Sequence, residues 1–586
     1  MPDQVVTPER PVVIFDGRCS FCRRWIEYFQ ALTAGRLDYV SAQERGVQSP
    51  QSVQLEQPGG ERLSGAHAVF EILRHSPGLV WLAWVYANLP LFGAVSEWAY
   101  RVIAGHRPFF DRLTTMLFGR TIRPLSYVFV EWIFLRVLGV IYFIAFVSFG
   151  TQVRGLIGSR GILPVHNYLQ AVSESFGFSR FWVAPTLFWF RHDDGFVVSI
   201  CIAGAALAIV LMLGYAQRLA MVLLFILYLS LCAVGQDFMS FQWDMLLLEA
   251  GFLAIFLGSS NIIIWLMRWL VFRLMFLSGA VKLMSHDPAW RSLDAMRFHY
   301  WTQPLPTPIA WYMNQLPAWF LRASTAGVFV IELLVPFLIF SPRRVRHLAG
   351  YCLIFLQVLI LTTGNYTFFN WLAIALCLFL FDDDTFPKWH VSRRALATSS
   401  RVAVALAILI AILSVFQLLG SLFDYTPLPA RALLRLAAPF GIVNTYGLFA
   451  VMTTERPEII VQGSQDGVNW LDYGFRYKPG DPRRPPPWVA PHQPRLDWQM
   501  WFAALSNWRG NPWFANFMVR LLEASPEVLA LMEKNPFPGT QPKYVRALVY
   551  AYRFTDFAER RATREWWHRE PKGTYFPAIS LNGVRP

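Results

Sequence analysis

The sequence predicts an α-helical multi-pass membrane bundle of about seven to nine spans, with a small N-terminal α/β domain and a C-terminal soluble α+β domain that has a β-rich start. Only 15% of the 586 residues are charged, against about 25% in a typical soluble protein, and 55% are hydrophobic. From residue 127 onward, apolar stretches recur with roughly the twenty-residue length that carries a helix across about 30 Å of hydrocarbon. Long stretches of this kind are confined to the middle of the chain, so we expect domains over residues 1–120, 121–425 and 426–586.

The distribution of charge and cysteine also indicates a membrane protein. Lys and Arg number 52 and Asp and Glu 38, a difference of +14, but the basic residues stand mostly in short clusters beside apolar runs. The excess of Lys and Arg in cytoplasmic loops explains such clusters, so we expect no nucleic-acid partner. Six cysteines are too few for a disulfide framework. Four of them lie in apolar runs, where we interpret them as packing residues: Cys201, Cys232, Cys352 and Cys377.

The first 120 residues predict a compact α/β unit that precedes the spans. The opening segment has no signal-peptide pattern, so we expect the N-terminus in the cytoplasm. The apolar segment 79–93 is short for a span and contains Asn88 and Pro90, which favours a buried core helix. The other expected elements are strands over 11–15 and 37–43 and helices over 22–34 and 66–74.

Nine apolar segments are candidates for membrane spans. The fourth and eighth are short, so the count falls to seven or eight if these two do not cross. The nine segments cover residues 127–149, 196–213, 218–235, 244–258, 262–283, 318–340, 346–363, 366–381 and 402–422.

Loop charges predict the orientation of the bundle. Basic residues cluster after the sixth segment, before the ninth and before the first, so these three loops should be cytoplasmic. Asp237 and Asp244 mark an opposite loop, and residues 423–586 should form a domain on that far side. The three basic clusters are Arg343, Arg344 and Arg346; Lys388, Arg393, Arg394 and Arg401; and Arg107, Arg112, Arg120 and Arg123.

The segment IFDGRCSFCRRWIEYF holds the clearest chemical motif. A strand is followed by a tight Asp-Gly turn, and Cys19-Ser-Phe-Cys22 opens a helix. Unpaired backbone N–H groups at a helix start, and nearby arginines, favour a thiolate. We expect Cys19 to attack a disulfide and Cys22 to resolve the mixed disulfide, with Asp16 as a proton acceptor or as a cap of the turn. The alternatives are half of a zinc site or an inert pair, but the domain has no second Cys-x-x-Cys and no His pair at ligand spacing.

This motif resembles the DCC family of thiol-disulfide oxidoreductases, which are thioredoxin-like domains. Asp16-Gly17-x-Cys19-x-x-Cys22 matches the pattern, GAHAVFEIL also looks like that family, and the resemblance covers residues 11–120. It implies a thioredoxin-like fold and a thiol redox partner. In a reducing cytoplasm such a pair should rest as thiols, which favours a reductase or a sensor over disulfide formation.

Charged residues within the apolar segments are candidates for function, because burying them in a membrane is costly. Mutual pairing is the interpretation we favour, for example Glu249 with Arg273 and Glu332 with Arg322. Lys282 stands at the end of a segment, where it is a snorkelling anchor or a functional lysine. The other charged residues of this set are Glu131, Arg136 and Arg268.

The outer parts offer further candidates. In the loop after Lys282, four side chains could gather near the mouth of the bundle, but their spacing is too loose for a metal site, and we expect neither metal nor cofactor. Four tryptophans of the C-terminal domain are core residues or, if exposed, a patch for a client protein or the bilayer. His492, Arg495 and Asp497 suggest a triad, but no G-x-S-x-G turn exists, and Ser506 lies outside such a turn. The loop residues are Asp287, Asp294, His299 and Tyr300, and the tryptophans are Trp498, Trp501, Trp508 and Trp513.

Residues 127–582 resemble the lipase maturation factor family. The matching motifs are SRGILPVHNYL, LLEAGFLAIFL, GNYTFFNWL, NTYGLF, RPEIIVQGSQDG, YKPGDPRRPPPWVAPHQPRLDWQMWFAAL and NPFP. The resemblance implies a multi-pass protein that helps secreted lipases fold in the endoplasmic reticulum of animals. The N-terminal DCC-type domain departs from the animal members and suggests a bacterial inner-membrane protein, or one of the endoplasmic reticulum membrane if the chain is eukaryotic.

Two functions remain open. The first is a membrane-embedded assembly factor whose partners are the bilayer, secreted clients such as lipases and a thiol redox partner. The second is a membrane enzyme distantly like the vitamin K-dependent carboxylase, in which Lys282 would serve as a base.

Overall fold

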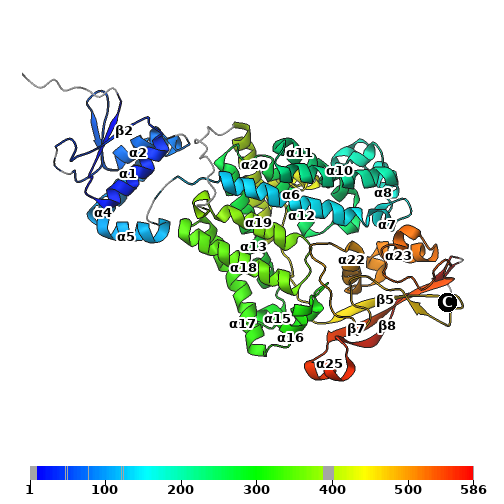
Figure 1. Ribbon diagram of the computed structural model, residues 1–586. Helices are drawn as coiled ribbons and strands as arrows, with labels where there is room; N and C mark the ends of the chain where they lie inside the picture. The colour runs from blue at the N-terminus through cyan, green and yellow to red at the C-terminus, as the bar shows by residue number, and fades with distance from the viewer. Residues whose placement is uncertain are drawn as a thin grey trace, which may run out of the picture.

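The computed structural model describes residues 10–46, 48, 50–76, 78–119, 122, 124–386, 401–581 and 583–584. Arg120, Arg123, Lys388, Arg393 and Arg394, which supported the expected orientation, lie outside these residues. An N-terminal α/β domain stands at one end of a helical bundle, and the strands of a C-terminal domain lie at the other end (Figure 1). The described chain thus has the expected three parts.

The N-terminal domain is built on a mixed four-stranded sheet in the order β2-β1-β3-β4, in which β1 is parallel to β2 and antiparallel to β3. Helix α1 covers the sheet through Ile26, Phe29 and Leu32, because these apolar positions recur on one face at helical spacing. The elements are β1 (Val12–Phe15), α1 (Ser20–Thr33), β2 (Asp38–Ser41), β3 (Gln54–Glu56), β4 (Arg62–Ser64), α2 (Gly65–Arg74), α3 (Val80–Asn88), α4 (Pro90–Gly105) and α5 (Arg107–Phe118).

The expected core helix over residues 79–93 is wrong. The segment forms two helices, α3 and α4, because Pro90 lacks a backbone N–H and cannot continue α3. Helix α3 is apolar on all sides, but only Ala83 is buried, while Trp81 and Trp84 are 59% and 62% exposed. The domain is too small to cover every face of so apolar a helix.

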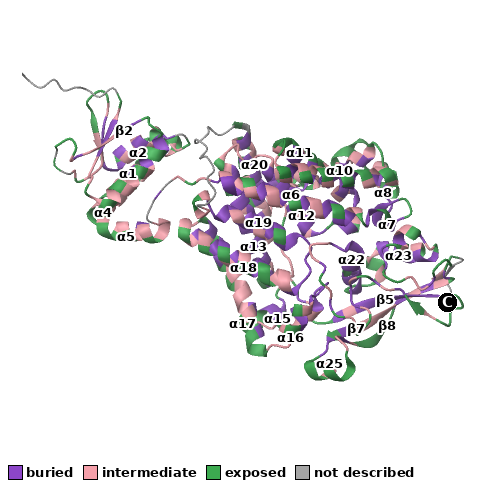
Figure 2. Ribbon diagram, viewed as in Figure 1, coloured by how far each residue is buried: buried purple, intermediate pink, exposed green. Residues whose placement is uncertain are grey.

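Seven described helices are long and apolar enough to cross a membrane. This is an integral membrane protein, and seven of the nine expected spans are long helices. Figure 2 shows that α13 is mostly buried inside the bundle, whereas α10 and α17 are only partly covered. The long helices are α6 (Val128–Gly150), α10 (Asp194–Leu213), α11 (Gln217–Val234), α13 (Asn261–Met284), α17 with η4 and η5 (Ala318–Phe340), α18 (Arg343–Thr363) and α20 (Arg401–Phe423).

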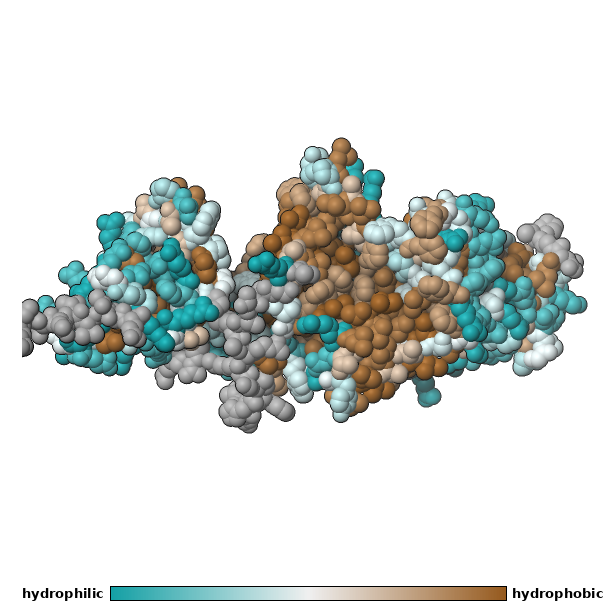
Figure 3. Space-filling model, turned by 90° about the horizontal axis from the view of Figure 1, so that it is seen from above, coloured by the Kyte–Doolittle hydropathy of each residue, from teal (hydrophilic) through white to brown (hydrophobic). Residues whose placement is uncertain are grey.

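The hydrophobic surface of the protein lies over the bundle. Figure 3 shows a broad apolar area over the middle of the molecule, with hydrophilic surface on both flanks. Such an area on a soluble protein would be exposed to water at a large cost, whereas lipid chains cover it without one. The apolar area therefore marks the part of the molecule that lies in the bilayer.

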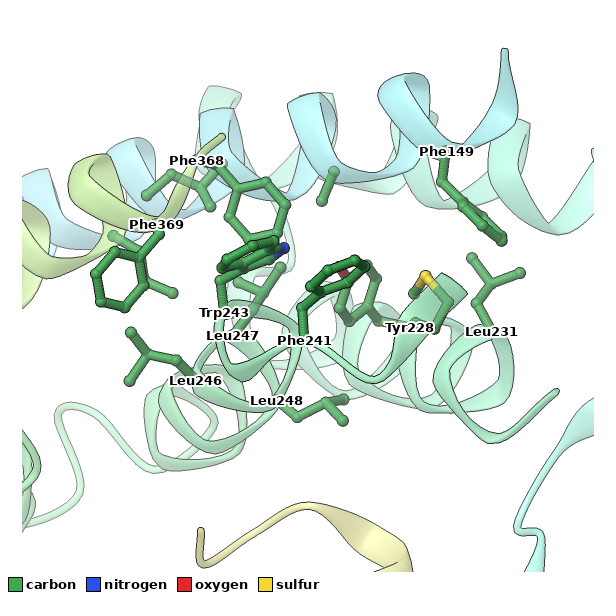
Figure 4. Packing of buried hydrophobic residues seen from close by; sticks show 14 of the residues in the cluster. Phe149, Tyr228, Leu231, Phe241, Trp243, Leu246, Leu247, Leu248, Phe368 and Phe369 are labelled. Atoms are coloured by element: carbon green, nitrogen blue, oxygen red, sulfur yellow. The ribbon is translucent and has the colours of Figure 1, made fainter. Parts of the chain in front are cut away.

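The fourth and eighth expected spans are short helices inside the bundle, α12 (Gln242–Ala254) and α19 (Phe369–Cys377). In Figure 4, Trp243, Leu246 and Leu247 of α12 pack in the core near Phe368 and Phe369 at the start of α19. A short helix leaves backbone groups free at its ends, which lipid cannot satisfy but neighbouring protein groups can. These two helices are therefore sheltered by the longer ones.

Other short helices connect the spans or lie at the ends of the bundle. In Figure 1, α15 and α16 lie beside β7, and α7 lies near α23. They are α7 (Val153–Ile157), α8 (Val165–Phe176), α9 (Arg180–Val183), α14 (Pro288–Arg291), α15 (Ala295–Thr302), α16 (Pro308–Asn314) and α21 (Leu428–Ala437).

The C-terminal domain contains a five-stranded antiparallel sheet in the order β6-β5-β7-β8-β9. Gly467 has φ +77° in the turn after β5, a conformation that glycine adopts without strain. Gly463 lies within β5, where a Cβ would stand 2.4 Å from the Phe537 ring. The elements are β5 (Arg456–Ser464), β6 (Leu471–Asp472), α22 (Arg495–Ala504), α23 (Pro512–Leu522), α24 (Pro526–Leu529), β7 (Tyr544–Phe554), α25 (Phe557–Thr563), β8 (Trp567–Ser580) and β9 (Gly583–Val584).

Candidate functional site

The two cysteines of the motif lie at the start of α1, directly after β1 and the Asp16-Gly17 turn. Cys19 is the N-cap residue, and its Sγ accepts a hydrogen bond from the backbone N–H of Cys22 at 3.2 Å. This interaction places the sulfur of Cys19 at the N-terminal end of the helix, which carries the positive end of the helix dipole. Both cysteines are free thiols and half-buried.

The surroundings of Cys22 favour its protonated form. Burial first, and then the hydrogen bond and negative charge of Cys19, raise the pKa of the Cys22 thiol to about 12, while the Arg107 guanidinium acts in the opposite direction. Cys22 is therefore suited to stay a thiol until a mixed disulfide has formed on Cys19.

Asp16 holds the turn that precedes the dithiol. Its Oδ1 accepts hydrogen bonds from the backbone N–H of Arg18 at 3.0 Å and from Gln43 Nε2 at 3.1 Å, and its Oδ2 is 3.8 Å from Arg107 Nη1. These contacts fit the expected role as a cap of the turn. The role of a proton acceptor stays a prediction.

Helix α5 closes one side of the dithiol site. Asp111 of α5 accepts a hydrogen bond from Ser20 Oγ at 3.0 Å and pairs with Arg24 at 3.3 Å. Arg24 also donates to Thr115 Oγ1 at 2.5 Å. Because α5 contacts α18 of the bundle, the site lies on the side of the N-terminal domain that meets the membrane part.

Within the bundle, some of the charged residues form ion pairs, whereas Arg268 donates to Phe379 O and Tyr127 Oη. Glu249 of α12 forms the expected ion pair with Arg273 of α13, and both are fully buried. The same carboxylate accepts hydrogen bonds from the backbone N–H of Asn444 at 3.0 Å and from Tyr446 Oη at 2.7 Å. Glu249 thus ties the bundle to the segment that leads into the C-terminal domain.

The expected pair of Glu332 with Arg322 is wrong. Residues 322 and 332 are about 15 Å apart along a helix, beyond the reach of the two side chains. Glu332 instead lies 2.7 Å from Lys282 Nζ, and Arg322 Nε lies 2.9 Å from Asp294. Lys282 Nζ also donates to Ser278 O at 2.9 Å, so it contacts two acceptors inside the bundle. The role of Lys282 as a base stays a prediction.

The four loop residues that could have formed one site serve separate contacts. Asp287 caps α14 and accepts from Met452 N, and Asp294 pairs with Arg322. Burial, followed by the charge of Lys282, lowers the pKa of His299 to about 4, and burial raises the pKa of Tyr300 to about 12. Among the described residues, no group of His, Cys, Asp and Glu is arranged to hold a metal ion.

The tryptophans of the C-terminal domain are mainly core residues. Trp498, Trp501 and Trp513 are buried, and Trp508 is half-buried. The Trp498 ring meets the Trp243 ring of α12 edge to face at 4.8 Å, and Trp501 Nε1 donates to Thr302 O at 2.8 Å. These contacts join the domain to the bundle, so the three buried tryptophans do not form an exposed client patch.

A second contact between the C-terminal domain and the bundle was not predicted from the sequence. Both Nη groups of Arg495 donate hydrogen bonds to the carboxylate of Asp244 at 2.9 Å, and both side chains are buried. The three residues that suggested a triad point to different partners. His492 Nδ1 is 2.9 Å from Ser148 Oγ, and Asp497 accepts from the backbone N–H groups of Tyr477 and Lys478. No sequence pattern links Asp244 with Arg495, because they belong to different domains.

Comparison with known families assigns each part of the chain. Residues 129–388 match the model of the lipase maturation factor transmembrane domain, and residues 442–577 match that of the lipase maturation factor C-terminal domain. Residues 13–113 match the DCC1-like thiol-disulfide oxidoreductase family.

Similar proteins from animals align with most of the chain. Lipase maturation factor 1 of Bos taurus is 37% identical over 506 residues, which cover 77% of this chain and 89% of that protein. Lipase maturation factor 2 of Homo sapiens is 34% identical over 585 residues, covering 77% of this chain and 82% of that protein. No solved structure matches the chain.

Proposed function

This chain belongs to the lipase maturation factor family and carries a DCC1-like thiol-disulfide oxidoreductase domain before its transmembrane part, and from this we propose its function. It is a membrane-embedded factor that helps exported proteins, lipases among them, to fold and assemble. The observation that carries this proposal is the identity of 37% to a lipase maturation factor over both the membrane and the C-terminal parts.

The N-terminal domain supplies a second activity in the proposal. The Cys19 thiolate attacks a disulfide of the partner, forming a mixed disulfide and releasing one partner thiolate. Cys22 then loses its proton and attacks Cys19 Sγ, which forms the Cys19–Cys22 disulfide and releases the second partner thiol. Two electrons pass from the dithiol to the partner. The cap position of Cys19 and the raised pKa of Cys22 support this order.

The two activities belong on opposite sides of the membrane in this proposal. Through α5, the dithiol domain contacts α18 near its Arg343 end, where the basic loop charges favour the cytoplasm. The C-terminal domain packs against the other end of the bundle, around Asp244 and the last residues of α15. The dithiol therefore exchanges with a cytoplasmic partner, and exported clients meet the C-terminal domain.

Co-expression with an exported lipase tests the assembly role. We expect the activity per mass of exported lipase to rise several-fold when the chain is present. An exported enzyme of another class serves as the control and should not change. Equal lipase activity with and without the chain would contradict the proposal.

Trapping in cells tests the dithiol. Cys22→Ser should leave Cys19 in a mixed disulfide with its partner, because the resolving thiol is gone. Cys19→Ser is the matched control and should trap nothing. An unreactive Cys19 in the Cys22→Ser chain would remove the oxidoreductase activity, and labelling of Cys19 in intact cells by a membrane-impermeant thiol reagent would overturn the cytoplasmic placement.

A further inference from the structure

The charges around the dithiol do not cancel. Two carboxylates lie close to it, and each has a cationic partner: Asp16 is 3.8 Å from Arg107, and Asp111 pairs with Arg24 at 3.3 Å. Arg18 and Arg23, which flank the two cysteines in sequence, are exposed. Neither guanidinium has a hydrogen bond or an ion pair with any residue in the described part of the chain.

Glu27 is the other acidic residue in this part of α1, four positions after Arg23. A pair at this spacing can form on a helix surface, but here Glu27 makes no ion pair with the described residues. Arg18 and Arg23 therefore leave two uncompensated positive charges at the edge of the dithiol. A cation without a protein partner at the rim of a reactive group is available to a ligand.

The space beside the dithiol is restricted. Helix α5 lies along one side through its contacts to Ser20 and Arg24, and α5 also contacts α18. Both thiols are only half-exposed. A small disulfide can approach the Cys19 sulfur along the remaining open side more easily than a folded protein surface can.

From these observations we propose that the dithiol acts on a small disulfide that carries carboxylates, and that Arg18 and Arg23 bind those carboxylates. This inference rests on the proposed oxidoreductase activity and specifies its substrate class. The reaction is the one given above: one disulfide bond of the substrate breaks, the Cys19–Cys22 bond forms, and the substrate leaves as two thiols. The guanidinium groups attract the anion and orient it, since they donate to carboxylate oxygens in paired geometry.

The test compares three small disulfides with the reduced full-length chain in a neutral detergent. Glutathione disulfide is anionic, hydroxyethyl disulfide is neutral and cystamine is cationic. We measure the rate at which the Cys19–Cys22 disulfide forms in a single turnover by mass spectrometry. The anionic probe should react fastest, and its advantage over the neutral probe should shrink in high salt because the attraction is between exposed charges.

The double variant Arg18→Gln/Arg23→Gln should lower the ratio of the anionic to the neutral rate by about fivefold at low salt. The matched control is Arg10→Gln/Arg36→Gln, which removes two exposed arginines near the other end of α1, where Arg10 and Arg36 contact only backbone carbonyls. That control should keep the ratio of the parent chain.

Each other outcome overturns the inference in a recognisable way. If the rates of all three probes fall together in Arg18→Gln/Arg23→Gln, the arginines act on the Cys19 thiolate rather than on the substrate. If the unchanged chain reacts equally with all three probes, the site does not recognise the charge of the substrate, and the proposed oxidoreductase activity is unaffected. If it reacts with none of them, the proposed oxidoreductase activity fails as well.

Discussion

The two sulfur atoms of the N-terminal domain lie one helical turn apart, but their surroundings give them different tasks. Cys19 caps the start of α1, where the backbone N–H of Cys22 stabilises its sulfur. Cys22 is within the helix, and burial raises the pKa of its thiol to about 12. In the proposed reaction, the order of attack and resolution follows from the positions of the two cysteines on the helix.

At the residue scale, the different surroundings of Cys19 and Cys22 predict how each thiol reacts with iodoacetamide. Near neutral pH, alkylation of the reduced chain should fall on Cys19, while Cys22 stays unmodified. The rate at Cys22 should rise about tenfold per pH unit as long as the pH remains below its pKa, because only the thiolate reacts. Peptide mass spectrometry of the alkylated chain measures both rates.

Cys19→Ser is the control variant for this experiment. It replaces a group whose negative charge raises the pKa of Cys22 by a neutral hydroxyl, so Cys22 should become more reactive at a given pH. Alkylation of Cys22 that is as fast as that of Cys19 in the parent chain would contradict the assignment of roles.

Single residues also mark the limit of what the sequence could predict. The Cys-x-x-Cys motif after a strand and a turn is local, so its placement at the start of α1 followed from the sequence alone. Ion pairs such as Lys282 with Glu332 join different helices, and their choice of partner depends on how those helices pack. The expected pair of Glu249 with Arg273 is present, but the partner of Arg495 came from another domain.

At the scale of elements, hydropathy predicts helices that face lipid. All seven long helices coincide with expected segments because a lipid-exposed face must be apolar over the whole bilayer thickness. Helices α12 and α19 have the same composition but are short, since the surrounding protein satisfies their ends. Strands β3 and β4 were missed because each has only three residues.

The close packing of α12 makes a prediction at this scale. In Gly251→Ala, the added Cβ would stand 1.9 Å from Tyr142 Oη of α6, so the buried Tyr142 side chain or one of the two helices must move. We expect a loss of about 1–3 kcal/mol in the free energy of unfolding. Thermal unfolding in detergent measures the loss of stability, and the amount of chain that stays monodisperse at each temperature is the readout.

Gly327→Ala on α17 is the matched control for Gly251→Ala. No atom lies within 4 Å of the Cβ position there, and alanine favours a helix over glycine, so stability should be equal or slightly higher. Equal unfolding temperatures for the two variants would show that α12 is not packed against α6 as described.

At the scale of the whole molecule, the bundle and the C-terminal domain form one structural unit. A single apolar core contains Phe149 and Trp243 of the bundle together with Trp498 and Phe514 of the C-terminal domain. The expected boundary between residues 425 and 426 stays a prediction, but residues 444–447 contact Glu249 and Gln242 inside the bundle. The spacing of apolar segments predicts separate domains but cannot reveal how they share a core.

Because the core is shared, we expect that breaking the ion pair between Asp244 and Arg495 destabilises the bundle and the C-terminal domain together. Asp244→Asn would leave Arg495 buried with a charge that lacks its carboxylate partner, which should cost about 3–5 kcal/mol. Asp294→Asn is the matched control, since its partner Arg322 is half-exposed and such surface pairs contribute at most about 1 kcal/mol. Thermal unfolding in detergent should show one transition that Asp244→Asn lowers strongly and Asp294→Asn barely changes. Two separate transitions, or equal shifts in the two variants, would mean that the C-terminal domain folds independently of the bundle.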